Sequence, residues 1–123
     1  MGNEPEHEGL REPPVAGVER NGDAVVVTLA GELDLYNAHV VRDALLEATG
    51  RSPERLIVDL SEVLFLDSTV LGVLIEARSG LANRRGFLLV APGVDTRRAL
   101  EISGLDKHFA VHASVDEALA ASV

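Results

Sequence analysis

A carboxylate is followed directly by two hydroxyl side chains in the run Asp67-Ser68-Thr69. The residues after this run carry apolar side chains at helical spacing, so Asp67 is placed to cap a helix by accepting backbone N–H groups of its first turn. A serine in a first turn is exposed, and a phosphate attached there gains from the helix dipole and from the unpaired N–H groups. Ser68 is therefore a candidate phosphorylation site, although the same run is also typical of an ordinary capped helix.

Phosphorylation of Ser68 would act through charge. A phosphoserine adds about 1.5 to 2 negative charges, and the chain already has a formal charge of −9. A partner carboxylate about 8 Å away, at an effective dielectric near 40, would be repelled by roughly 2 kcal/mol, which is about a thirtyfold loss of affinity. That magnitude is sufficient for a switch.

The residues do not favour an enzyme. The sequence has neither the G-x-x-x-x-G-K-[ST] loop nor a G-x-G-x-x-G run after a strand, and Ser68 lacks the G-x-S-x-G setting and a histidine at a related spacing. His108 and His112 are four residues apart, but the residues between them are typical of a strand, where the two would lie about 13 Å apart. We expect no catalytic activity, no cofactor and no metal site.

Composition limits the partners. The 123 residues, of which 46% are hydrophobic, suffice for one domain with one core. An excess of 20 acidic over 11 basic residues and a 3% aromatic content argue against nucleic acid and an anionic membrane surface as partners. Cysteine is absent, and the acidic, proline-containing segment 1–14 lacks the apolar stretch of a secretory signal. We expect a cytoplasmic protein with a flexible tail over 1–14.

The elements that position Ser68 follow from periodicity and turn residues. The turn pair Asn21-Gly22 separates two strands, Asn37 is a plausible helix cap, and a loop is expected between residue 60 and Asp67. Strands are predicted over 15–20, 24–30, 56–60, 87–91 and 109–112, and helices over about 38–49, 68–81, 96–102 and 115–120. This order predicts an α/β domain with an N-terminal β-hairpin, a mixed sheet of about five strands, and four helices.

Three motifs, in this order and spacing, resemble a known family. They are Gly31-Glu32-Leu33-Asp34, then Asp59-Leu60-Ser61, then Asp67-Ser68-Thr69-Val70-Leu71-Gly72. Together they resemble the STAS domain of bacterial anti-sigma factor antagonists, over about residues 15–121. The resemblance implies a protein that binds a serine-kinase anti-sigma factor while unphosphorylated, so that the sigma factor is released. The kinase then phosphorylates the antagonist, and a phosphatase of the PP2C type resets it.

The resemblance also assigns roles to residues. It implies that Ser68 is the phosphoacceptor, with Thr69 as second choice, and that Asp67 caps the helix beside it. Asp34 takes the acidic loop position near the acceptor, and Glu32 and Leu33 flank it on the docking face.

One position departs from the family pattern, in which Ser-Ser/Thr-Gly-Leu-Gly follows the acidic residue. Here Val70 replaces the first of those glycines and adds a β-branched side chain at the expected docking face. We expect either a partner shaped to accept Val70 or slower phosphorylation, and a chain that is a monomer or a weak dimer. The alternative is a STAS scaffold of a larger, stressosome-like signalling assembly without its own phosphorylation switch.

Overall fold

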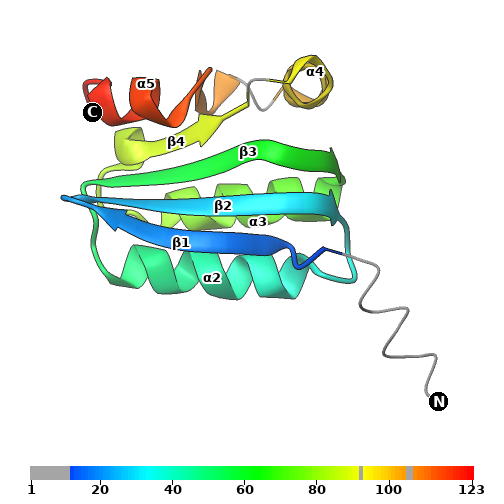
Figure 1. Ribbon diagram of the computed structural model, residues 1–123, viewed down its shortest axis with the longest axis horizontal. Helices are drawn as coiled ribbons and strands as arrows, with labels where there is room; N and C mark the ends of the chain where they lie inside the picture. Colours follow the sequence, from blue (N-terminus) through cyan, green and yellow to red (C-terminus); the bar gives the residue numbers. More distant parts are fainter. Residues whose placement is uncertain (1–11, 92, 105–106) are drawn as a thin grey trace.

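The computed structural model describes residues 12–91, 93–104 and 107–123, which form an α/β domain around one mixed sheet (Figure 1). The sheet has the order β1-β2-β3-β4-β5, with β1 antiparallel to β2 and every other neighbouring pair parallel. Its strands are β1 (Val15–Asn21), β2 (Ala24–Leu33), β3 (Arg55–Leu66), β4 (Phe87–Val90) and β5 (Ala110–His112). The predicted fold class is confirmed. Most of the expected N-terminal tail, residues 1–11, lies outside the described residues.

The hairpin between β1 and β2 turns one residue later than the sequence suggested. Asn21 pairs with Ala24 as the last residue of β1, so Gly22 and Asp23 form the two-residue turn. Gly22 has a φ of +60°, a conformation that glycine adopts without steric cost. The carbonyl of Asp23 accepts the N–H of Glu54 (2.9 Å), which fixes the start of β3 against the turn.

Strand β3, with 12 residues, is more than twice as long as the predicted strand over 56–60. The segment from Ser61 to Leu66, expected to be a loop, continues the strand and pairs with the end of β2. Its register shifts twice against β2, so β3 contains two more residues than its partner there. These irregularities leave Leu60, Val63 and Leu66 buried at intervals of three. Because a bulge breaks the alternation of a strand, the sequence pattern was not recognisable as one.

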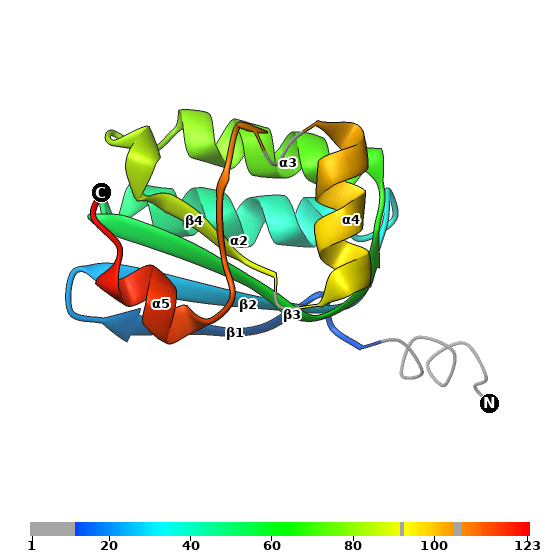
Figure 2. The same cartoon turned by 90° about the horizontal axis from the view of Figure 1, so that it is seen from above.

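Helices cover both faces of the sheet (Figure 2). They are α2 (Ala38–Gly50), α3 (Ser68–Ser79), α4 (Val94–Ser103) and α5 (Val115–Ala120), with a 3-10 turn, η1 (Arg84–Gly86), before β4. The larger core packs α2, α3 and Leu100 of α4 against one face, while α5 covers a smaller cluster around Ile57 and Leu88 on the other. The central strands are buried on both faces, which explains their continuous apolar runs.

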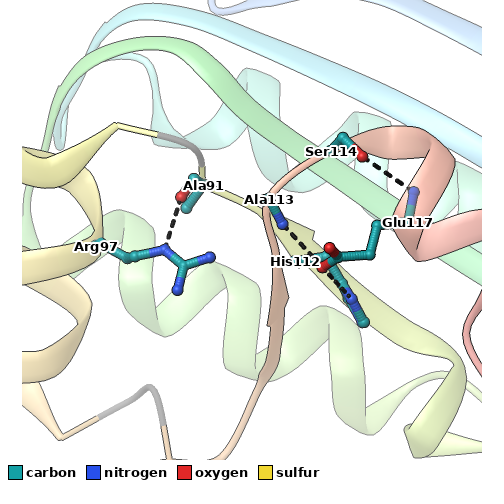
Figure 3. A network of polar contacts seen from close by, with 6 residues as sticks. All are labelled: Ala91, Arg97, His112, Ala113, Ser114 and Glu117. Carbon is teal, nitrogen blue, oxygen red and sulfur yellow. Dashed lines mark hydrogen bonds and ion pairs between the residues drawn. The ribbon is translucent and has the colours of Figure 1, made fainter.

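Reciprocal hydrogen bonds of Ser114 and Glu117 cap the N-terminus of α5 (Figure 3). The Ser114 hydroxyl accepts the N–H of Glu117 (3.1 Å), and the Glu117 carboxylate accepts the N–H of Ala113 (3.1 Å) and contacts Nδ1 of His112 (3.0 Å). The bond from Ala113, and then that from His112, lowers the pKa of the Glu117 carboxyl. Nearby, Nε of Arg97 donates to the carbonyl of Ala91 (3.0 Å), which holds α4 to the end of β4.

Candidate docking and phosphorylation site

Helix α3 begins as the sequence predicted. Asp67 is its N-cap, with an extended backbone, and its carboxylate accepts the N–H of Val70 (3.1 Å). Ser68 is the first residue of the helix, and Ser68 and Thr69 are both exposed. Among the described residues, no hydrogen bond of the Ser68 hydroxyl is found. The hydroxyl is therefore free to react without disturbing an internal contact.

The acidic loop after β2 lies beside the start of α3. The N–H of Asp67 donates to the carbonyl of Leu33 (3.1 Å), and Leu33 pairs with Leu66 in the sheet. Asp34 directly follows Leu33, and Ser68 directly follows Asp67, so the two residues come next after this hydrogen bond on neighbouring segments of the chain. The structure thus brings together the loop and the hydroxyl that the sequence placed 34 positions apart.

Asn37 holds this loop rather than the helix that follows it. It occupies the N-cap position of α2 as expected, but its side chain makes no capping hydrogen bond. Instead its Oδ1 accepts the N–H of Asp34 (2.9 Å), and its Nδ2 donates to the carbonyl of Glu32 (2.9 Å). The Asp34 carboxylate in turn accepts the N–H of Tyr36 (3.0 Å). These local bonds fix the loop in one conformation.

Two residues expected on the docking face point away from it. The side chains of Leu33 and Val70 are both 0% exposed and belong to the larger core. Val70 packs inward because it lies on the same face of α3 as Leu74 and Ala77, whereas Ser68 and Thr69 lie on the other. The branched side chain that departs from the family pattern therefore fills the interior and adds no bulk to the surface.

Four exposed apolar side chains, which were not foreseen from the sequence, lie in the segments at the carboxyl ends of β2 and β3. They are Leu35 (63% exposed) and Tyr36 (75%) in the loop after β2, and Leu64 (75%) and Phe65 (54%) near the end of β3. Phe65 pairs with Glu32, so the two groups meet at the carboxyl end of the sheet. Neighbouring exposed apolar residues of this size are typical of a protein interface. The sequence signal for Leu64 and Phe65 was a run of adjacent apolar residues within a segment that was predicted to be a loop.

The exposed face of α3 continues from Ser68 through Gly72 to Glu76. An added Cβ at Gly72 would meet nothing within 4 Å, so no packing contact in the chain requires a glycine there. Glu76 lies two turns beyond Ser68 and makes a bidentate ion pair with Arg42 of α2 (2.9 and 3.0 Å). The hydrogen bond between these two side chains lowers the pKa of the Glu76 carboxyl and raises the pKa of the Arg42 guanidinium. This pair ties α2 to α3 at the far end of the exposed face.

The described residues contain no group of three or more His, Asp or Glu side chains arranged to hold a metal ion. His108 lies just before β5, and His112 is the last residue of that strand. No helix within the described ranges combines the length and the apolar character that crossing a bilayer requires.

Comparison with known proteins agrees with this architecture. The family model of the STAS domain matches residues 16–118. The chain is 35% identical over 105 residues to the anti-sigma-F factor antagonist RsfB of Mycobacterium tuberculosis, covering 85% of each chain. It is 38% identical over 89 residues to an anti-sigma-B factor antagonist of Listeria monocytogenes, covering 71% of this chain and 77% of the other.

A solved structure extends the likeness to three dimensions. The crystal structure of an anti-sigma factor antagonist from Mycobacterium paratuberculosis superposes with a TM-score of 0.79 at 37% identity, covering 84% of this chain and 88% of the other. The chain belongs to the STAS domain family, as its three motifs indicated.

Proposed function

We propose that this protein is an anti-sigma factor antagonist whose unphosphorylated form binds a serine-kinase anti-sigma factor and thereby releases the sigma factor. The observation that carries the proposal is the placement of Ser68, an exposed hydroxyl at a capped helix start beside exposed apolar side chains. The names of the relatives at 35% and 38% identity support the same role.

The docking surface, as we define it, consists of exposed side chains around the start of α3: Glu32, Leu35, Tyr36, Leu64, Phe65, Ser68 and Thr69. Its apolar members supply area that a partner can remove from water. Asp34, partly buried, supports the surface from the loop, and Asp67 supports it by capping α3. Leu33 and Val70 contribute through the core alone.

Phosphorylation of Ser68 turns binding off by changing charge rather than fold. A phosphate on the first residue of α3 is compatible with the helix, because it lies where the dipole and the free N–H groups favour an anion. At the docking surface it adds negative charge beside Glu32 and Asp34. Repulsion from one partner carboxylate about 8 Å away amounts to roughly 2 kcal/mol. A PP2C-type phosphatase restores the binding form.

The test combines phosphorylation with binding. Incubation with the cognate kinase and ATP should add one phosphate at Ser68, read by mass spectrometry of the intact protein and of its peptides. Wild type and Ser68→Ala should bind the kinase alike. Ser68→Glu should bind about fivefold more weakly by calorimetry, because its single added charge gives about half the repulsion of a phosphate. The matched control is Ser79→Glu, which adds the same charge to an exposed serine at the far end of α3.

Three results would contradict the proposal in different ways. Labelling of Ser68→Ala at the wild-type level would move the acceptor to another residue, with Thr69 the first to be examined. Equal affinities for wild type, Ser68→Ala and Ser68→Glu would instead identify a scaffold without its own phosphorylation switch. Equal weakening by Ser68→Glu and Ser79→Glu would show a general effect of charge.

A further inference from the structure

A basic hollow lies at the amino end of strands β4 and β5, and the proposed function does not use it. The hollow has a volume of about 380 Å³, and its cationic lining comprises Arg78, Arg84, Arg85 and Lys107. Because β4 and β5 are parallel, with Leu88 opposite Ala110, the segments that precede the two strands lie side by side. Arg78 reaches the same hollow from the last turn of α3. Residues from three separate segments therefore converge there.

These four cations are unlike most others in the chain. Five arginines each donate to a carboxylate or to a backbone carbonyl: Arg20, Arg42, Arg51, Arg55 and Arg97. Within the described ranges, no ion pair or side-chain hydrogen bond is found for the four cations that line the hollow. In an acidic protein, where carboxylates are abundant, a concentration of unpaired cations in one place indicates a site for an anion.

Among the described residues, none that lines the hollow carries a carboxylate. Two other hollows also contain arginine, but each includes acidic side chains, Asp23 and Glu54 in one and Glu19 and Asp59 in the other. In the basic hollow the remaining polar groups include His108 and His112, and His112 is held by Glu117. Beneath them, the rings of Phe87 and Phe109 pack with centroids 5.6 Å apart. In the described part of the chain, the hollow thus combines a pair of packed aromatic rings with four cations that have no carboxylate partner.

We propose that this hollow binds a small anion that carries two linked phosphate groups, either free or as part of a nucleoside diphosphate. Guanidinium groups match phosphate oxygens with paired N–H donors, and Arg84 and Arg85 are adjacent and exposed. A single phosphate neutralises at most two of the four cations, whereas a diphosphate can engage all of them. The volume of the hollow exceeds what one phosphate group fills.

The test is calorimetric titration of the full chain with inorganic pyrophosphate at constant ionic strength, with ¹H–¹⁵N spectra to locate the ligand. We expect saturable binding of one pyrophosphate, with shifts at Arg78, Arg84, Arg85 and Lys107. The double variant Arg84→Gln/Arg85→Gln should weaken binding at least about tenfold, because it removes charge-assisted hydrogen bonds. The matched control is Arg98→Gln, which removes an exposed arginine of α4 that does not line the hollow.

Titrations with other ligands show whether the diphosphate is a free anion or part of a nucleotide. Tighter binding of ADP than of pyrophosphate supports the proposal and assigns a nucleotide, and the reverse order supports it and assigns the free anion. Orthophosphate bound as tightly as pyrophosphate would overturn the requirement for two phosphates. Absence of saturable binding, or equal weakening by Arg98→Gln, would overturn the site. Equal binding of a poly-glutamate peptide would assign the hollow to an acidic protein segment and overturn the small-anion proposal.

Discussion

Helix α3 presents Val70, Leu74 and Ala77 to the core and Ser68, Gly72 and Glu76 to solvent. The inward residues are exposed by 0 to 1% and pack with the sheet and α2, so every atom on that face has a neighbour. On the outward face, no hydrogen bond of the Ser68 hydroxyl is found among the described residues, Gly72 has open space, and the Glu76 carboxylate is paired with Arg42 of the neighbouring helix. Packing within the chain accounts for the first face, whereas the second face is accessible to solvent and to a partner.

The largest expected effect is on the buried face. Leu74→Ala should lower the free energy of unfolding by about 2 to 5 kcal/mol, because it removes methyl groups and leaves a cavity. The matched control is Ile75→Ala, the next residue, whose side chain is 43% exposed and should cost about 1 kcal/mol or less. Urea denaturation followed by circular dichroism measures both. Equal costs would show that the two faces do not differ as described.

The glycine on the outward face should separate stability from binding. Gly72→Ala should raise the free energy of unfolding by about 0.5 to 1 kcal/mol, because alanine favours a helix and its Cβ meets no other atom. If the docking surface extends along α3, the added methyl group should also weaken binding of the anti-sigma factor. Urea denaturation and calorimetry measure the two effects. A more stable variant with unchanged affinity would limit the docking surface to the first turn of α3.

The smallest effect concerns the exposed ion pair of Arg42 with Glu76. The hydrogen bond from Arg42 lowers the pKa of Glu76 below its ordinary value of 4.5 in the folded state. The pair therefore stabilises the fold above that pH, and its contribution is lost as the pH falls through the lowered folded-state pKa. Denaturation between pH 3 and 7 should show a slightly weaker pH dependence for Glu76→Gln than for wild type.

Arg42→Gln serves as the control for that measurement, because it removes the same interaction from the other side. Both variants should lose the same small part of the pH dependence, and the effect should shrink at high salt because exposed pairs are screened. A loss seen in Glu76→Gln alone would mean that Arg42 is not the cause.

Local signals were sufficient for much of this molecule. The helix start at Asp67, the exposed hydroxyl of Ser68, the hairpin and the order of strands and helices all depend on capping, turn and periodicity rules that act within a few residues. Asn37 shows their limit: the residue type correctly marked the start of α2, but its side chain bonds to the preceding loop. The Asn37 amide has possible partners both in the first turn of α2 and in the loop before it. The course of the chain after β2 brings the loop partners within reach.

The sequence by itself determined the α/β class, the capped helix and the motifs of the STAS family. Only the tertiary structure decided that β3 continues to Leu66, because its bulges hide the strand pattern and pairing with distant β2 holds it. The same packing buries Leu33 and Val70 and leaves Leu64 and Phe65 exposed. The basic hollow likewise exists only because parallel strands bring separate segments to one edge. The sequence states the chemistry of each side chain, whereas the pairing of strands that are distant in the sequence decides which side chains lie next to one another.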